Sequence, residues 1–332
     1  MKNSQTKDIL KKIKSSKKIL IPLHGGPDGD SLGSCAAVEY WLKRDFNKEV
    51  KLISKDSLGE TLSKFNFAGD IEFGIGIEDI NLEEFDLILF LDHGAPLYSL
   101  SDLKIVFPKD SVINIDHHGT NNYFGDLNYV DSKRPSCCSI LSDLFKEWKI
   151  KFDEELSTRL LIGVYTDSGE FCHDNGNALK DAVFLIDKGA DYLEGVVNVI
   201  RYNIPLGVKK YHALLTNNLK IIDFLMCKVG VSSTSLKEVK KLKINLSEIR
   251  SGPNYLQEIG GIDFLFTLAE MEDEIKGSFR SRKKIDVSLF AKELGGGGHK
   301  FAAAFRLPKM PLKKAEKIVF DAIKKTGIHK AE

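Results

Sequence analysis

The stretch Lys18–Asp30 has the sequence KILIPLHGGPDGD and decides which fold this chain can adopt. Its first half, Lys18–Leu23, is a short apolar run that predicts a buried β-strand. A polar turn with two adjacent glycines follows, and an apolar helical pattern then extends from Leu32 to Leu42. A strand, a tight turn and a helix in this order are typical of α/β proteins, whose parallel strands are covered by helices on both faces.

Acids and histidines gather where the predicted elements end. Further buried strands are predicted at Phe85–Leu91 and Ser111–Ile115, and a helical pattern ends in the sequence VYTDSGEF. The side chains at these ends are His24, Asp28, Asp30, Asp92, His93, Asp116, His117, His118 and Asp167. Because the carboxyl ends of parallel strands meet at one edge of a sheet, we expect the clusters to converge on one site.

Such a set of carboxylates and imidazoles is what a pair of divalent cations requires. Two ions about 3.5–4 Å apart can clamp a phosphate, activate a water molecule and stabilise the leaving oxygen. Oxygen ligands mixed with imidazole favour Mn²⁺ or Mg²⁺ over metals that prefer thiolates. Taken one at a time, these residues are more often turn caps, solvated loops or surface histidines. The four clusters together favour the metal site.

The rest of the sequence predicts a second, smaller α/β domain. A mostly helical stretch from Ala178 to Leu219 leads into new strand patterns, so we place the boundary near residue 210 and expect domains 1–210 and 211–332. The strands predicted here are Ile221–Val231, Asp263–Ala269 and Glu274–Arg280. The other predicted helices of the chain are Ser136–Trp148, Asp153–Val164, Leu236–Lys241, Val287–Glu293 and Pro311–Lys324.

The run Gly295–Gly298, followed by His299, is a candidate anion-binding loop. Glycines can adopt positive φ and bring backbone N–H groups close to a phosphate. Arg280, at the end of a predicted strand, is a candidate bidentate phosphate donor. The alternatives are a flexible linker for the glycines and an ordinary surface charge for the arginine. Apolar patterns on both sides of the glycines weigh against the linker.

The composition excludes several classes of protein. The 332 residues, 42% hydrophobic and 29% charged, have the balance of a globular chain. A net charge of +1 gives no sign of a long nucleic-acid tract, so a small anionic partner is expected. No run of roughly 18 apolar residues predicts a membrane span, and the N-terminal stretch lacks the apolar core of a secretory signal. The five cysteines contain no C-x-x-C pair, which fits a cytoplasmic location.

Together the motifs resemble those of the DHH/DHHA1 phosphoesterase family. The residues that carry the resemblance are His24-x-x-x-Asp28-x-Asp30, Asp92, Asp116-His117-His118, Asp167 in TDSGEF, and the sequence GGGGHKFAAAF of Gly295–Phe305. They extend over nearly the whole chain and are most similar to the nanoRNase/pAp-phosphatase branch. The resemblance implies a parallel-sheet DHH domain, a helical linker and a DHHA1 substrate-binding domain, in a hydrolase acting on phosphate esters of short nucleotides.

The resemblance also implies a role for each site residue. The residues implied for one cation are His24, Asp28 and Asp92. Those implied for the second cation are Asp30, Asp92, His117 and Asp167. Asp92 would bridge the two ions, His118 would face the phosphate and assist the leaving group, and Asp116 would orient the histidines. The residues implied for the substrate are Arg201, Arg280, Ser281, Gly296, Gly297, Gly298 and His299.

The expected reaction is attack by a water molecule that two cations, Mn²⁺ or Mg²⁺, activate. The expected substrates are short RNA oligonucleotides, pApA or pAp. The family also suggests that the protein is a homodimer. A cyclic di-AMP phosphodiesterase stays open as an alternative. A manganese-dependent inorganic pyrophosphatase is suggested by the basic stretch Ser281–Lys284 but opposed by the GGGGH motif. The chain is short for an exonuclease that acts on long strands. A nucleotide sensor without activity and an α/β scaffold with polar surface clusters are the non-enzymatic alternatives.

Overall fold

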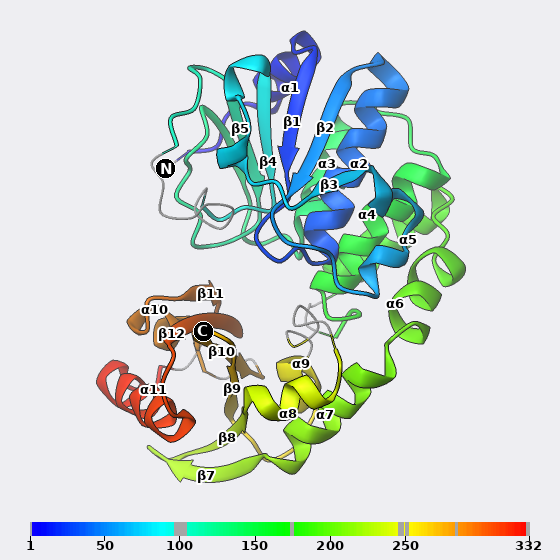
Figure 1. Cartoon of the computed structure of the whole chain (residues 1–332). Coiled ribbons are helices and arrows are strands. Elements are labelled where there is room, and N and C mark those ends of the chain that lie inside the picture. Colours follow the sequence, from blue (N-terminus) through cyan, green and yellow to red (C-terminus); the bar gives the residue numbers. More distant parts are fainter. Residues whose placement is uncertain are drawn as a thin grey trace. The chain divides into compact units, whose positions relative to one another are not determined.

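The computed structural model describes residues 2–95, 105–172, 176–244, 249, 252–282 and 285–329. These form two compact units, Met1–Asn203 and Ile204–Glu332, each built on its own sheet (Figure 1). The boundary expected near residue 210 falls inside helix α7 (Leu206–Asn217), the first helix of the second unit. No helix among the described residues is long and apolar enough to cross a membrane.

The first unit contains a six-stranded sheet in the order β3-β2-β1-β4-β5-β6, in which every neighbouring pair is parallel. The strands are β1 (Lys18–Pro22), β2 (Glu49–Ser54), β3 (Ile71–Phe73), β4 (Leu87–Leu91), β5 (Val112–Asp116) and β6 (Leu127–Val130). The predicted strands β1, β4 and β5 are confirmed, and so is the α/β class. Strands β2, β3 and β6 were not predicted, because they are short or carry charged residues among the apolar ones.

Both faces of this sheet are buried, and successive residues of a strand contribute to different cores. Ile19 and Ile21 of β1 pack with the α-helices, whereas Leu20 belongs to a separate apolar cluster. The helices that pack with the first face are α1 (Thr6–Ser15), α2 (Gly29–Phe46), α3 (Cys137–Glu147) and α4 (Glu154–Asp167). The second face is covered by the 3₁₀ turns η3 (Ile77–Asp79) and η4 (Leu82–Glu84) and by loops, whereas the sequence predicted helices on both faces.

The strand order makes β1 and β4 the centre of the unit. The chain proceeds from β1 outward to β2 and β3, and then returns to β4 on the other side of β1. At such a reversal the connections leave in opposite directions, and open α/β sheets commonly bind ligands there, at the carboxyl ends of the strands. The first two acid and histidine clusters of the sequence directly follow these two strands.

The first unit is completed by short and mainly helical segments. These are η1 (Leu62–Lys64), η2 (Asn66–Asp70), α5 (Asn177–Asp187), the π-helical turn η6 (Leu193–Val197) and α6 (Asn198–Tyr202). The helical pattern predicted after Ala178 is therefore confirmed, in broken form.

The second unit also contains a six-stranded sheet, in the order β11-β12-β10-β9-β8-β7. Its strands are β7 (Lys220–Phe224), β8 (Cys227–Thr234), β9 (Phe264–Glu270), β10 (Glu274–Ser281), β11 (Gly297–His299) and β12 (Ala302–Pro308). All pairs are antiparallel except β8 with β9. Besides α7, its helices are α8 (Leu236–Lys241), α9 (Gly252–Leu256), α10 (Ser288–Glu293) and α11 (Leu312–Thr326). Helices α10 and α11 belong to one apolar core, and α7, α8 and α9 to another.

The single strand predicted at Ile221–Val231 is wrong, because this segment folds as the hairpin β7–β8. The turn is made by Leu225 and Met226, which both have positive φ, 48° and 63°. Such two-residue turns normally contain Asn-Gly or similar residues, since positive φ is costly for side chains with a Cβ atom. An apolar turn gives no signal in the sequence, so the two strands appeared continuous.

Candidate metal centre

The predicted metal-site residues of the first unit lie at one edge of its sheet. His24 follows β1, Asp92 follows β4, and Asp116 is the last residue of β5. His117 and His118 directly follow β5. The other acids come from helix ends: Asp28 caps α2, Asp30 is in its first turn, and Asp167 is the last residue of α4. Within the described residues of this unit, three groups of side chains each present ligand atoms within 4.8 Å of one another. Their members are His24, Asp28 and Asp92; Asp30, Asp92 and His117; and Asp92, Asp116 and His118.

Asp92 lies at the centre of the cluster and belongs to all three groups. Its Oδ2 atom is 3.4 Å from His24 Nε2, and its Oδ1 atom is 3.4 Å from His117 Nε2. The residue is 3% exposed and has a positive φ of 63°. Asp tolerates this left-handed conformation better than most residues, but such strain persists only where the surroundings impose it. The two oxygens of one carboxylate therefore serve two different imidazoles.

The imidazole of His117 faces three carboxylates with a single nitrogen. Its Nε2 atom is 3.4 Å from Asp92 Oδ1, 3.4 Å from Asp167 Oδ2 and 3.8 Å from Asp30 Oδ2. One proton on this nitrogen can form a good hydrogen bond to only one of the three oxygens. The arrangement instead suits a cation that shares all four groups as ligands.

Asp30 is held by the beginning of helix α3. The backbone N–H of Cys137 donates to Oδ2 at 2.6 Å, and that of Cys138 donates to Oδ1 at 3.0 Å. Ser136 caps the same helix by accepting from the N–H of Ser139. Free N–H groups in the first turn of a helix are well suited to bind a carboxylate. No sequence pattern indicates this contact, because backbone atoms that are distant along the chain provide it.

Asp28 and His24 form the part of the site nearest to β1. Asp28 accepts from the backbone N–H groups of Asp30 and Ser31, both at 3.0 Å, and so caps helix α2. His24 Nε2 is 3.5 Å from Asp28 Oδ1. The ordinary alternative for the Asp28–Asp30 turn was a solvated loop. In the structure Asp28 is a helix cap, and the same carboxylate also faces the cluster.

His118 and Asp116 form a hydrogen-bonded pair at the end of β5. The distance between His118 Nδ1 and Asp116 Oδ1 is 2.6 Å, and the side chain of Asp116 is fully buried. The Nδ1 atom must therefore carry a proton that it donates to the carboxylate. The side chain of His118 is 25% exposed, so the imidazole is held from behind while part of it remains accessible.

Burial and the charges of the cluster raise the pKa values of three of its members. Burial and the carboxylates of Asp92 and Asp167 raise the pKa of Asp30 well above its ordinary value. Burial, opposed by His117 but reinforced by Asp28 and Asp92, raises the pKa of Asp167 to about 7. Burial alone would lower the pKa of His117, but Asp167 and Asp92 raise it well above its ordinary value. Such shifts are expected where several acids share one site without enough positive charge.

No lysine or arginine supplies the missing charge within the part of the chain that the structure describes. Histidines are the partners in the ion pairs of Asp28, Asp30, Asp92, Asp116 and Asp167 among the described residues. The buried Oδ1 atom of Asp92 also has no hydrogen-bond donor among these residues. A buried carboxylate oxygen without a donor is costly, and a bound cation removes this cost. The donor set therefore fits divalent cations.

The predicted substrate residues of the second unit lie around β10 and β11. Arg280 Nε donates to Asn254 Oδ1 at 2.5 Å, and Ser281 Oγ accepts from the N–H of Ile285 at 3.1 Å. Gly297, Gly298 and His299 form β11, the edge strand of the sheet, paired with Ala304, Ala303 and Ala302. Two of the four glycines are thus part of a strand, and the run is not a flexible linker. Residues Lys283 and Lys284 of the basic stretch lie outside the described residues.

The glycines of this run are required by close packing. A Cβ atom at Gly298 would lie 2.6 Å from the carbonyl oxygen of Ala302, and one at Gly296 would collide with the carbonyl oxygen of Ala304. Only a residue without a side chain can approach β12 so closely. Burial lowers the pKa of Arg280 to about 10, so its guanidinium is still charged at neutral pH.

Arg201 lies in the first unit, in helix α6, and forms an ion pair with Glu170 at 2.8 Å. Glu170 and Phe171 both have positive φ, 57° and 69°, in the turn that follows Asp167. The predicted substrate-side arginine is thus connected to the loop of a predicted metal ligand through an acid that the sequence analysis did not single out.

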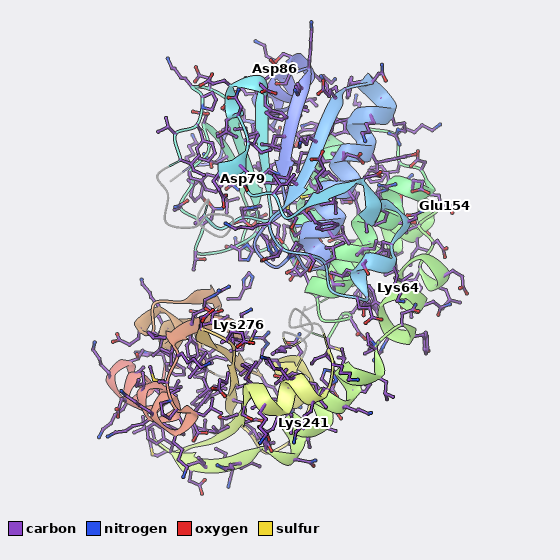
Figure 2. All side chains as sticks on the ribbon, viewed as in Figure 1. Lys64, Asp79, Asp86, Glu154, Lys241 and Lys276 are labelled. Atoms are coloured by element: carbon purple, nitrogen blue, oxygen red, sulfur yellow. The ribbon has the colours of Figure 1, made fainter. Side chains whose placement is uncertain are left out.

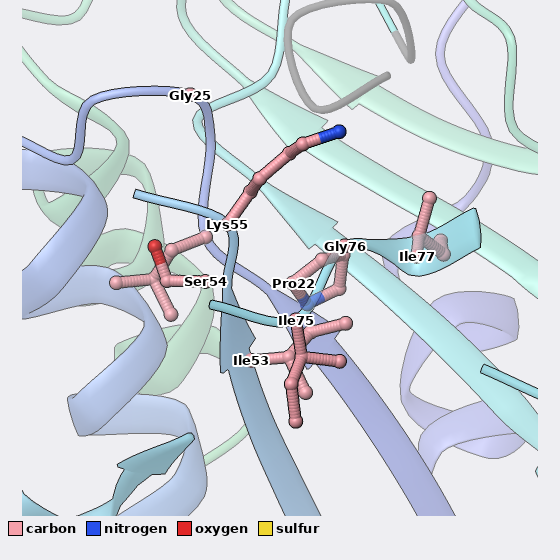
Figure 3. A pocket seen from close by; sticks show the side chains of 9 residues that line it. Pro22, Gly25, Ile53, Ser54, Lys55, Ile75, Gly76 and Ile77 are labelled. Carbon is pink, nitrogen blue, oxygen red and sulfur yellow. The ribbon is translucent and has the colours of Figure 1, made fainter. Parts of the chain in front are cut away.

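A shallow hollow lies beside the cluster, at the carboxyl ends of β1 and β2 (Figure 3). Its walls include Pro22 and Ile53 from these strands, Gly25 from the loop after β1, and Ile75. Lys55 stands at its rim and forms an ion pair with Glu78. Apart from its contact with the loop of His24, the hollow contains none of the predicted site residues.

Comparison with known proteins matches each unit to a known domain family. Residues 18–164 match the DHH family N-terminal domain, and residues 229–326 match the DHHA1 domain. The bifunctional oligoribonuclease and PAP phosphatase NrnA of Thermus thermophilus is 27% identical over 319 residues, which cover 96% of this chain and 92% of that protein.

Two solved structures share the fold. An exopolyphosphatase-related protein from Bacteroides fragilis superimposes with a TM-score of 0.83 at 22% identity and covers 96% of both chains. The exonuclease RecJ bound to manganese has a TM-score of 0.51 at 16% identity, over 98% of this chain and 95% of that one. At these identities the likeness establishes the fold alone.

A parallel sheet whose central strands end in a cluster of acids and histidines, joined to a DHHA1 unit, defines a phosphoester hydrolase. The two matched domains together account for most of the sequence. The chain belongs to the DHH/DHHA1 phosphoesterase family.

Proposed function

We propose that the chain hydrolyses phosphate esters of short nucleotides, namely oligoribonucleotides of a few residues, pApA and pAp, by two-metal water attack. The relative from Thermus thermophilus is named for an oligoribonuclease and PAP phosphatase activity and aligns over nearly its full length. The small net charge of the chain is also consistent with a short anionic substrate.

The observation that carries this proposal is the position of Asp92 between two imidazoles. One ion would be held by His24, Asp28 and Asp92 Oδ2, and the other by Asp30, His117, Asp167 and Asp92 Oδ1. A carboxylate that turns one oxygen to each half of a site is the expected bridge between two cations. Oxygen and imidazole donors favour Mn²⁺ or Mg²⁺.

The bound cations would activate water and neutralise the charge that develops on the phosphate oxygens. The side chains of the protein would position the substrate and transfer the proton. His118, held by Asp116 at 2.6 Å, would face the phosphate and deliver a proton to the leaving oxygen. Asp116 would keep the Nδ1 proton in place and so fix the ring orientation.

The second unit would bind the nucleotide. The guanidinium of Arg280 can pair with a phosphate, and Ser281, Gly296, Gly297, Gly298 and His299 surround the same end of the sheet around β11 and β12. Arg201 would assist once its pairing with Glu170 is exchanged for a phosphate. Substitutions of these residues are therefore expected to change KM rather than metal binding.

A substrate panel tests the proposal. The turnover rate of purified protein with added Mn²⁺ is measured on pAp, pApA, cyclic di-AMP, inorganic pyrophosphate and RNA of 2 to about 10 nucleotides. An enzyme for short substrates should discriminate among RNAs of these lengths. Metal-dependent turnover that is fastest on pAp, pApA or the shortest RNAs is the expected outcome. Preference for cyclic di-AMP or pyrophosphate would replace the proposed substrate, and no turnover with any of them would refute the function.

A further inference from the structure

We propose that Asn121 is a positioning residue of the active site, which holds both the Asp116–His118 pair and the backbone next to Asp92. The role of Asn121 rests on the proposed function, because it acts through residues assigned to that reaction. The residue lies in the loop after β5 and was not singled out by the motifs. Its side chain joins the two loops that follow the strands β4 and β5.

The first contact is with Asp116. Asn121 Nδ2 donates to Asp116 Oδ2 at 2.6 Å, while the other oxygen of this carboxylate accepts from His118 Nδ1. Asp116 is fully buried, so each of its two oxygens is committed to one of these partners. The amide thereby prevents the carboxylate from rotating, and a fixed carboxylate fixes the ring plane and tautomer of His118.

The second contact is with the carbonyl group of His93, the residue that follows Asp92. Asn121 Nδ2 donates to the carbonyl oxygen of His93 at 2.9 Å, and Asn114 Nδ2 donates to the same oxygen at 3.1 Å. Two amides thus hold one carbonyl group directly after a residue with a positive φ of 63°. Strained backbone persists only when its surroundings impose it. These hydrogen bonds supply that constraint for Asp92.

The orientation of the Asn121 amide is itself fixed. Its Oδ1 atom accepts from the backbone N–H of Tyr123 at 2.7 Å, which leaves the nitrogen to face the site. The two N–H groups are surrounded by three acceptors, because Asn114 Oδ1 lies 2.8 Å from the same nitrogen. A side chain of similar shape without donors cannot replace it, since a carboxylate here would face Asp116 and two further oxygens.

The test uses Asn121→Asp, which keeps the shape and the acceptor for Tyr123 but removes the donors, and Asn121→Ala. Asn128→Ala is the matched control. Asn128 lies in the adjacent strand β6, and its amide is also largely buried. The amide forms hydrogen bonds of 2.6 and 3.0 Å with the backbone of Gly125. For each variant, kcat and KM on pApA are measured across pH with Mn²⁺. Thermal unfolding reports folding, and the ¹⁵N spectrum of His118 reports its tautomer.

We expect both Asn121 variants to lower kcat by about 10- to 100-fold, the range seen when groups that orient metal-site residues are removed, with little change in KM. The pH profile of kcat should shift, and the His118 spectrum should lose its single Nδ1–H form. Asn128→Ala should keep the kcat and the profile of the wild type. A wild-type pH profile and spectrum in a folded Asn121 variant, or an equal loss of kcat in the control, would overturn the inference.

The spectrum separates this inference from the proposed function. If the wild-type protein cleaves none of the nucleotides tested, the function fails. The His118 tautomer in Asn121→Asp still decides whether Asn121 positions the pair.

Discussion

Asp92 combines three properties at one position: it is buried, its backbone is strained, and it faces both halves of the cluster. Its neighbour along the chain, His93, is fully buried, packs edge-on against His24 with ring centroids 6.0 Å apart, and has its pKa lowered to about 4 by burial. His93 therefore remains neutral and serves as a packing partner of a predicted metal ligand. The chemistry of this site depends on such neighbours as well as on the ligands.

We expect Asp92→Asn to abolish turnover and the Mn²⁺-dependent rise in melting temperature, because the bridging carboxylate is lost. Asp86→Asn is the matched control, since Asp86 precedes the same strand at its opposite end and accepts from the N–H groups of Lys17 and Lys18 (Figure 2). Turnover assays and thermal unfolding with and without Mn²⁺ give the comparison. Activity close to the wild type in the Asp92 variant would contradict the two-metal assignment.

At the scale of elements, helix α3 acts as a support for Asp30. Its first two backbone N–H groups bind the carboxylate, and Ser136 fixes where the helix begins. The sequence predicted this helix within a residue at each end but not its contact with the site. Helix propensity and capping are local properties, whereas the approach of Asp30 depends on how α2 packs against α3.

Ser136→Ala should reduce stability by about 0.5–2 kcal/mol through the loss of the cap. It should also weaken Mn²⁺ binding by about 10-fold, the lower end of the effect of removing groups that hold metal ligands. Ser235→Ala removes the cap of α8 in the other unit and is the control for stability alone. Urea unfolding and metal titration by calorimetry measure the two effects. Equal metal affinity in both variants would show that α3 does not hold Asp30.

The glycines in and before strand β11 have two possible roles, anion binding and close packing against β12. The glycine run was singled out because glycines can surround an anion. In the structure, Gly296 and Gly298 are also required because β12 leaves no room for a Cβ atom. The N–H of Gly296 moreover donates to the carbonyl of Ala291 at 2.7 Å, so it is committed within the chain.

Gly296→Ala should displace β11 from β12 and cost about 1–3 kcal/mol, the usual penalty of overpacking. If β11 contributes to nucleotide binding, KM for pApA should rise as well. Gly260→Ala is the control, because a Cβ atom there meets no atom within 4 Å and should change stability by less than about 0.5 kcal/mol. Urea midpoints and KM values test this, and an unchanged KM in a destabilised Gly296 variant would remove β11 from the binding surface.

At the scale of the whole molecule, the near-zero net charge conceals a division between the units. Acidic residues outnumber basic ones in Met1–Asn203, and basic residues outnumber acidic ones in Ile204–Glu332. The acidic unit contains the candidate metal centre and the basic unit the residues proposed for the nucleotide. The overall charge argued only against a long basic tract, whereas the charge of each unit is consistent with the ligand proposed for that unit.

Metal removal should therefore act on one unit only. EDTA is expected to destabilise Met1–Asn203, and Mn²⁺ at about 100 times its Kd should stabilise it by about 2.7 kcal/mol. Hydrogen exchange resolves the effect: amides in the loops of His24, Asp92 and His117 should exchange more slowly with Mn²⁺, while those of β7 and β8 should not change. Equal protection in both units, or none, would argue against a metal centre confined to the first unit.

The sequence by itself determined the α/β class, the central strands β1, β4 and β5, and the identity of the acids and histidines that follow them. These features are local, since apolar runs and motif spacing are read along the chain, and parallel strands bring their carboxyl ends together. Only the tertiary structure decided that α3 binds Asp30 through its backbone and that Asn121 joins two loops. It also decided that Asp92 adopts a positive φ and that an apolar turn divides β7 from β8. Finally, it decided that Gly296 and Gly298 lie too close to β12 to carry a Cβ atom. These features depend on backbone groups and close contacts between distant segments, which no pattern of side chains in the sequence records.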